Sequence, residues 1–147
     1  MSKYKLVIIS FFIIFNSAFF SCTTNISNNY DKITFLDEIT INDIRSGYKN
    51  KIFSVKDIVS GYLENIKTID DSGPALNSII TINPDALNIA DSLDNILKLG
   101  KPIGPLFGIP VLLKDNINTN DKMPTTGGSR ILRNSYPIHD SWIAEKL

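Results

Sequence analysis

One lysine in this chain stands where it could do chemistry. Lys114 directly follows the short apolar run 109–113 and precedes a polar stretch that begins with Asp115. A brief apolar run bounded by glycine and turn residues is typical of a strand buried on both faces, and Pro110 fits the first residues of such a strand. Lys114 would then project from the strand's carboxyl end, where ligands usually bind in α/β sheets.

A lysine in that place has two interpretations. Removal from water disfavours the charged amine and lowers its pKa, and a lysine that is neutral near pH 7 can act as a general base. In the other interpretation, the side chain extends past the strand and pairs in solvent with Asp115 or Asp121, since lysines are mostly exposed. The spacing alone leaves both interpretations open.

The residues before the lysine predict the helices that must position it. Thr40 with Asp43, and Ser54 with Asp57, have the three-residue spacing of an acidic capping box. An apolar stripe at helical spacing follows Ser54 and predicts a helix that faces a core. The stripe comprises Val55, Ile58, Val59, Tyr62, Leu63 and Ile66.

A further helix is expected after Asn83. Asn83 would cap this helix, Pro84 would occupy its first position, and Gly100 would end it. Two carboxylates within the helix, Asp91 and Asp94, are expected on its solvated face.

Strand signals alternate with these helices. Residues 70–74 have the composition of a loop, and the Ile-rich stretch 76–82 is typical of a strand, as is 109–113. This alternation predicts an α/β fold in which helices flank a sheet.

Residues 125–147 predict a loop and the start of a helix. Residues 125–129 are small, flexible and hydroxyl-bearing, as in a loop. Asp140 is expected to cap a final helix, and its neighbour His139 is expected to be a surface or capping residue rather than a catalytic base. The inward residues of this helix would be Trp142, Ile143 and Leu147.

The first 21 residues have the composition of an export signal. Lys3 and Lys5 precede the mostly apolar stretch 6–20, which is short for a bilayer span of about 20 residues. The stretch ends in Phe-Phe-Ser-Cys, which resembles the lipobox of bacterial lipoproteins. Cys22 would become the lipidated first residue and hold the protein on a membrane surface without spanning it. The alternatives are an ordinary signal peptide or an uncleaved anchor, with Cys22 incidental.

Charge and cysteine usage narrow the class of protein. The chain has 15 basic and 15 acidic side chains, and removal of residues 1–21 leaves 13 against 15, a net charge of −2. No basic run or patch is visible, so nucleic acid is not expected as a partner. One Cys and one His exclude a multi-Cys/His metal site and an internal disulfide. We expect a signal peptide at 1–21, a tether at 22–39 and a domain portion at 40–147.

The stretch 104–129 resembles the first core block of the amidase signature family, which are serine hydrolases of amide bonds. Residues 104–117 read Gly-Pro-Leu-Phe-Gly-Ile-Pro-Val-Leu-Leu-Lys-Asp-Asn-Ile, and residues 125–129 read Thr-Thr-Gly-Gly-Ser. The likeness covers about residues 76–147, with a weaker match from about residue 40. It implies an α/β fold with a mixed sheet flanked by helices, truncated here to its N-terminal part.

The resemblance also implies a mechanism. Lys114 would be the base of a Ser–cis-Ser–Lys triad that acts on a small-molecule or peptide amide, with no metal or organic cofactor. The segment that supplies both serines is not in this chain, and Ser129 follows Lys114 too closely to be the nucleophile, so we expect Ser129 to shape the loop. A piece with one triad member is expected to be inactive alone.

Three functional hypotheses follow. The first is the N-terminal part of an exported, lipid-anchored amidase of the bacterial cell envelope. The second is the amidase subunit of a glutamine-dependent tRNA amidotransferase, against which the export signal argues. The third is a surface lipoprotein that binds a ligand without catalysis.

Overall fold

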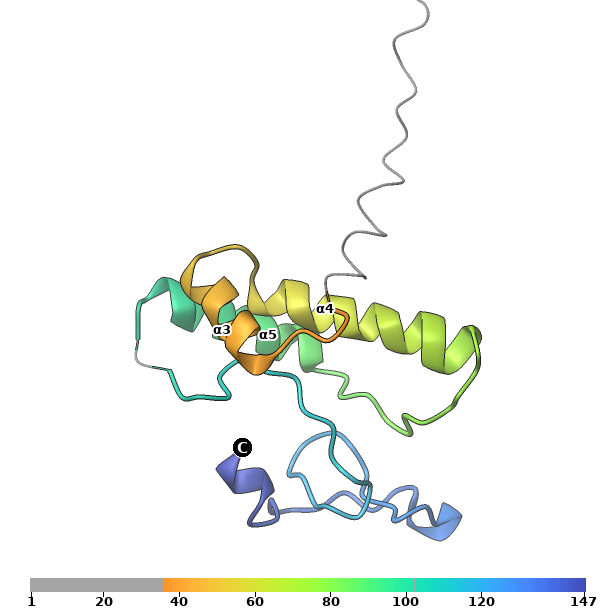
Figure 1. The fold of residues 1–147 in the computed structure, drawn as a ribbon. Coiled ribbons are helices and arrows are strands. Elements are labelled where there is room, and N and C mark those ends of the chain that lie inside the picture. The colour runs from red at the N-terminus through yellow and green to blue at the C-terminus, as the bar shows by residue number, and fades with distance from the viewer. Residues whose placement is uncertain (1–35, 102) are drawn as a thin grey trace, which may run out of the picture. The chain divides into compact units, whose positions relative to one another are not determined.

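The computed structural model describes residues 36–101 and 103–147, so the expected signal peptide, Cys22 and most of the tether lie outside the described residues. Figure 1 shows the helices α3, α4 and α5 followed by a chain of turns and loops. The helices are α3 (Ile41–Lys49), α4 (Val55–Asn65), which continues into the π-helix η1 (Ile66–Ser72), α5 (Ala86–Lys98), and the short 3-10 helices η2 (Arg130–Leu132) and η3 (Ala144–Lys146). Within these ranges, no helix has the length and apolar character that a membrane crossing requires.

Helices α3 and α4 begin at the two capping boxes predicted from the sequence. The Thr40 hydroxyl accepts the Asp43 N–H at 3.2 Å, and the Asp43 carboxylate accepts the Thr40 N–H at 3.1 Å. Ser54 and Asp57 form the same reciprocal pair, at 3.0 Å in both directions. Each box satisfies N–H groups that a helix start otherwise leaves unpaired, so both starts are decided by nearby residues.

The helices share a small apolar core, and Val55, Ile58, Val59 and Tyr62 of the predicted stripe belong to it or pack against it. This confirms that part of the stripe as core packing. Phe107 and Ile109, from the chain after the helices, pack against this core. Gly47 lets the Phe53 ring lie against α3, because a Cβ at residue 47 would be 2.0 Å from Phe53 Cζ. The buried apolar residues are Leu36, Ile44, Tyr48, Val55, Ile58 and Ala90.

Helix α5 differs from its prediction at the start and on one face. Its N-cap is Asp85, two residues after the expected Asn83, whose side-chain oxygen instead accepts the Asp85 N–H at 2.9 Å. Gly100 follows the helix with φ +64°, as expected of a residue that ends one.

The two carboxylates of α5 have different environments. Asp91 is solvated and pairs with Lys56 at 2.8 Å, as predicted. The prediction of a solvated Asp94 is wrong, because only 8% of this residue is exposed. It accepts the backbone N–H groups of Val55 at 2.7 Å and Lys56 at 3.1 Å. Asp94 therefore caps α4 from another helix, a role that no local spacing could have indicated.

The expected loop 70–74 begins later than predicted, because residues 70–72 belong to η1. Asp70 is buried at that helix, where its carboxylate accepts the N–H groups of Ser78 at 2.8 Å and Ile79 at 3.0 Å. These two bonds fold the chain back onto the end of η1.

The expected strands at 76–82 and 109–113 are not strands in the described residues. A strand exists through hydrogen bonds to a neighbouring strand, and here the backbone bonds to nearby residues of the same chain instead. Examples are Asn77 N–H to Asp70 O at 3.0 Å and Ile109 N–H to Leu106 O at 3.1 Å. The mixed sheet is thus not confirmed by the described part of the chain.

The expected final helix is replaced by the single-turn η3, which starts four residues after Asp140. Asp140 instead accepts the Asn120 N–H at 2.6 Å, so its carboxylate joins two loops. Trp142 is 73% exposed rather than inward. His139 is exposed, as predicted.

Candidate functional site

The segment that leads to Lys114 is anchored on the helices at Gly108. Its carbonyl accepts the Tyr48 hydroxyl at 2.7 Å, and its φ of +72° is one that side chains with a Cβ rarely adopt. A Cβ there would also lie 2.8 Å from Val55 Cγ2. Burial raises the pKa of Tyr48, and nearby Asp94 adds to this effect, so the phenol remains a donor at neutral pH. Glycine at 108 therefore determines where the segment 109–114 begins.

Lys114 itself is exposed, so the expectation that it is held out of water is not met in the described chain. The alternative ion pairs with Asp115 or Asp121 are not found among the described residues either. Its carbonyl accepts the Ile117 N–H at 2.9 Å and opens a tight turn. The run before it is uncovered as well, since Leu112 is 75% and Val111 48% exposed. Exposed apolar side chains of this kind mark a surface that packs against something else.

Asp115 ties the lysine to the loop 125–129. Its Oδ1 accepts the Thr126 N–H at 3.0 Å and its Oδ2 accepts the Gly128 N–H at 3.0 Å. The Thr126 hydroxyl donates to the same carboxylate, and the Gly127 N–H donates to the Asp115 carbonyl at 2.9 Å. The bond from the Thr126 hydroxyl is the main cause that lowers the pKa of Asp115. The two backbone N–H groups add to it, and so does the charge of Lys114.

The loop 125–129 is confirmed as a loop. Gly127 and Gly128 have φ of +55° and +78°, and an added Cβ at either would meet no atom within 4 Å. Positive φ at two successive residues lets their N–H groups turn toward one acceptor, here Asp115. The Ser129 N–H closes a turn on the Thr126 carbonyl at 2.9 Å, which agrees with a loop-shaping place for that residue.

Sequence reasoning missed the anchoring residues of this site. The sequence indicated Asp115 only as an ion-pair partner of Lys114, and it gave no role to Tyr48 or Gly108. A carboxylate followed at short distance by Thr-Thr-Gly-Gly is a signal for such a loop, because a free carboxylate can accept several backbone N–H groups. Within residues 36–101 and 103–147, no three His, Cys, Asp or Glu side chains gather as a metal ion would require.

The arrangement fixes the backbone that carries the Lys114 amine. One side of the segment is anchored on the helices through Gly108 and the other is clamped by Asp115, so the backbone around Lys114 is held at both ends. An amine presented in this way can accept a proton from a neighbouring hydroxyl once it is neutral.

Comparison with known proteins defines the class first through the fold. The chain superposes on the crystal structure of a peptide amidase in complex with the competitive inhibitor chymostatin. The TM-score is 0.71 at 35% identity over 75% of this chain and 22% of that one. An amidase family protein from Bacillus anthracis gives a TM-score of 0.74 at 31% identity over 85% of this chain and 24% of that one. This part of the chain therefore has the amidase signature fold.

The family profile described as Amidase matches residues 57–147, and the chain belongs to this family, whose members hydrolyse amides. One subunit of the glutamyl-tRNA(Gln) amidotransferase of Alkaliphilus metalliredigens is 42% identical over 113 residues, which are 76% of this chain and 22% of that protein. A putative amidase of Schizosaccharomyces pombe is 38% identical over 112 residues, or 76% of this chain and 19% of that protein. The chain thus spans about a fifth of the length of these relatives.

Proposed function

We propose that the complete protein is an amidase that cleaves a carbon–nitrogen amide bond by a Ser–cis-Ser–Lys mechanism, with Lys114 as the base. Both serines would come from the part of the complete protein that lies outside this chain. Residues 36–147 would supply the base Lys114 and the hydrogen bonds that hold the backbone around it. The substrate is a small-molecule or peptide amide. The 147-residue piece alone would be inactive, because the triad acts as a unit.

The observation that carries this proposal is the block 104–129. It contains Lys114 inside the matched region 57–147, and the backbone on both sides of the lysine is fixed, by Tyr48 to Gly108 and by Asp115 to Thr126 and Gly128. Two independent anchors around one amine favour a positioned group over an incidental surface lysine.

The proposed steps move one proton through three groups. The neutral Lys114 amine takes the proton of the cis-serine, which takes the proton of the nucleophilic serine as that oxygen attacks the amide carbonyl. The proton then passes to the leaving amine, and water releases the acid from the acyl-enzyme. Burial of Val111 and Leu112 under the rest of the protein would also take Lys114 out of water. Desolvation favours the neutral amine that a base requires.

The place of action that we propose is the bacterial cell envelope. The support is the sequence alone: the charged start, the apolar stretch 6–20 and Cys22 at its end. A lipid on Cys22 would anchor the enzyme to a membrane surface. Labelling of the complete protein with a radioactive fatty acid, with and without Cys22→Ser, tests this part, and label that survives the substitution would exclude it.

The experiment for the base is Lys114→Ala in the complete protein, assayed by release of amine from simple and peptide amides. We expect loss of about 10³-fold in kcat/KM, the scale of general-base catalysis. Lys122→Ala is the matched control, because this exposed lysine follows closely in the chain and pairs with Asp85 at 2.6 Å. Undiminished activity of Lys114→Ala would rule out the proposed base.

A second candidate is the amidase subunit of a glutamine-dependent tRNA amidotransferase, favoured by the 42% identity with a subunit of such an enzyme. The export signal argues against this candidate, since charging of tRNA takes place in the cytosol. Cell fractionation with N-terminal sequencing decides between the two. A cytosolic product with an intact start at Met1 would support the second candidate.

A further inference from the structure

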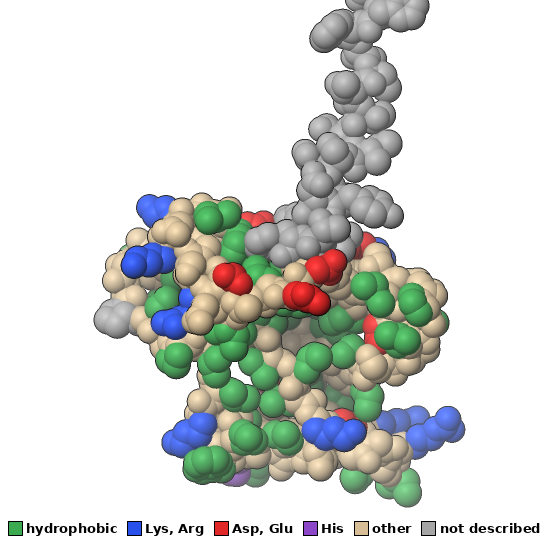
Figure 2. All heavy atoms as spheres, viewed as in Figure 1, with side chains coloured by type: hydrophobic (Ala, Val, Ile, Leu, Met, Phe, Trp, Pro, Cys, Tyr) green, Lys and Arg blue, Asp and Glu red, His purple; other side chains and the backbone are tan. Residues whose placement is uncertain are grey.

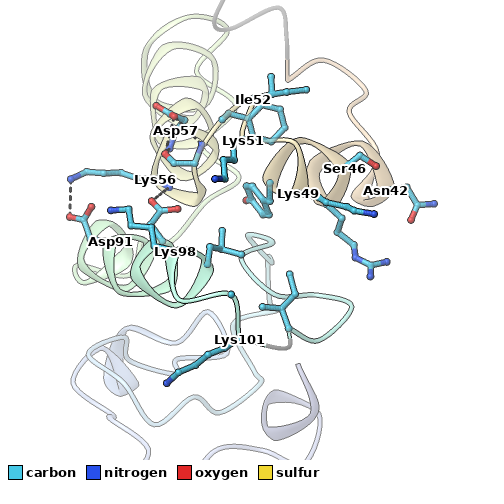
Figure 3. Close-up of a pocket in the computed structure, with 18 residues that line it drawn as sticks. Asn42, Ser46, Lys49, Lys51, Ile52, Lys56, Asp57, Asp91, Lys98 and Lys101 are labelled. Carbon is cyan, nitrogen blue, oxygen red and sulfur yellow. Dashed lines mark hydrogen bonds and ion pairs between the residues drawn. The ribbon is translucent and has the colours of Figure 1, made fainter.

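A basic hollow lies among the helices, and its lining includes Tyr48, whose hydroxyl donates to Gly108 of the candidate site. It has a volume of about 1370 Å³ and is lined by residues of α3, the turn after it, the start of α4 and the end of α5. Figure 3 shows its lysines on separate elements: Lys49 and Lys51 at and just after the end of α3, and Lys98 and Lys101 at and just after the end of α5. We name it the α3/α5 hollow.

The carboxylates in the α3/α5 hollow are already engaged. Asp94 accepts the first N–H groups of α4, Asp91 pairs with Lys56 at 2.8 Å, and Asp57 accepts the Ser54 hydroxyl at 2.8 Å. Figure 3 shows the Lys56–Asp91 pair within the hollow. With six basic and three acidic side chains, the lining of the hollow keeps a net positive charge.

Five cations of the hollow have no carboxylate within ion-pair distance among the described residues. They are Arg45, Lys49, Lys51, Lys98 and Lys101. The described chain as a whole has a slight negative net charge, since residues 36–147 carry 12 basic and 14 acidic side chains. Positive charge is thus concentrated in one place on a slightly acidic piece, and Figure 2 shows basic side chains gathered over the ends of α3 and α5. Such a patch attracts anions.

We propose that the α3/α5 hollow binds the phosphate headgroups of an anionic membrane, as a second contact beside a lipid on Cys22. The inference rests on the proposed lipid anchor and not on the amidase chemistry. Leu36, the first described residue, is buried. It is 14 residues after Cys22, so the chain between them spans at most about 50 Å. A polybasic surface near a lipid anchor adds electrostatic attraction to anionic lipids.

The test uses the complete protein from residue 22 onward with Cys22→Ser, so that neither a lipid on Cys22 nor the apolar stretch 6–20 can bind the vesicles. Co-sedimentation compares vesicles of equimolar phosphatidylglycerol and phosphatidylcholine with vesicles of phosphatidylcholine alone. The hollow variant is Lys49→Gln/Lys51→Gln/Lys101→Gln, and the matched control neutralises Lys67, Arg130 and Lys146, which are also exposed. We expect the hollow variant to lose about fivefold in partitioning for each lysine, or about 100-fold together, and the control far less.

Three results would overturn the proposal. They are equal losses in both triple variants, no preference for anionic vesicles, and displacement from vesicles by inorganic phosphate at matched ionic strength, which would identify a site for free phosphate. Amide hydrolysis by the hollow variant should equal that of the parent. Failure of lipid binding is therefore separate from failure of the amidase proposal, which Lys114→Ala reports.

Discussion

The helices from α3 to α5 and the chain from residue 103 to 147 are stabilised by different interactions. The helices start at capping side chains and share a core that contains every buried apolar side chain of the described residues. Among residues 103–147, no side chain is buried. This later region is ordered by turns and by three carboxylates that accept backbone N–H groups, namely Asp115, Asp121 and Asp140.

This difference bears on where function resides. The region with a core carries no candidate catalytic group, and the region that carries Lys114 leaves large apolar side chains uncovered. The candidate site is thus held by hydrogen bonds between a carboxylate and nearby backbone N–H groups. Its exposed apolar surface needs further packing to exclude water. The helices hold the start of that region in place through the hydrogen bond from Tyr48 to Gly108.

Among the residues that support Lys114, the largest effect should come from Asp115, which holds the loop 125–129. Asp115→Asn in the complete protein keeps the side-chain shape but replaces one acceptor oxygen with a donor, which opposes the N–H group facing it. We expect kcat to fall about 10- to 100-fold with KM little changed, because a small displacement of a positioned group costs that much. Asp121→Asn is the control, since Asp121 bonds only within its own turn, to Thr119 and Met123. Equal losses in both variants would show that Asp115 has no special positioning role.

The stability of the helices should depend on Asp94, the buried cap of α4. Asp94→Ala leaves two N–H groups at the start of α4 without their acceptor and is expected to lower the free energy of unfolding by about 2 to 3 kcal/mol. Asp91→Ala on the same helix removes an exposed ion pair and should change it by less than about 0.5 kcal/mol. Urea unfolding of the complete protein, followed by hydrogen exchange at Val55 and Lys56, measures both. Similar effects would contradict the distinction drawn between these carboxylates.

Low pH should lower the stability of both the helices and the chain from residue 103 to 147. Hydrogen bonds from Ser78 and from the N–H groups of Ile79 and Ser78 lower the pKa of Asp70, and the Thr126 bonds lower that of Asp115. A carboxyl with a lowered folded-state pKa adds stability above its unfolded value of about 3.9 and loses it as the pH falls through the folded value. We expect unfolding midpoints to be flat near neutrality and to fall below about pH 4. Asp70→Asn and Asp115→Asn should each reduce this fall, and an unchanged acid profile in both would refute the assignment.

The smallest effect should be a slight increase in the free energy of unfolding, from a substitution at Lys51. Lys51 follows the end of α3 with φ +55°, a conformation that costs a residue with a Cβ and that glycine adopts freely. Lys51→Gly should raise the unfolding free energy by about 0.5 kcal/mol, whereas Lys49→Gly inside the last turn should lower it by about 1 kcal/mol. Thermal or urea unfolding compares the two. Destabilisation by Lys51→Gly would show that the lysine side chain itself stabilises this turn.

Prediction from sequence succeeded where neighbours in the chain decide the structure. The caps at Thr40 and Ser54, the stripe on α4 and the stop at Gly100 all depend on residues a few positions apart. The loop 125–129 was predicted from its own small residues, although its hydrogen bonds to Asp115 reach farther along the chain. Prediction failed where a partner lies far along the chain, as with Asp94, which caps α4 across 39 positions. It also failed for the strands 76–82 and 109–113, whose definition requires a neighbour to pair with.

The sequence by itself determined the family, through the block 104–129, and the helices that begin at their own caps. It singled out Lys114 as the candidate base, which stays a prediction. Only the tertiary structure decided that Tyr48 and Asp115 anchor the two sides of this lysine, that Asp94 is buried, and that the cations of the α3/α5 hollow meet in one place. The reason is physical: capping and periodicity act within one or two turns, whereas these contacts depend on how separate elements pack.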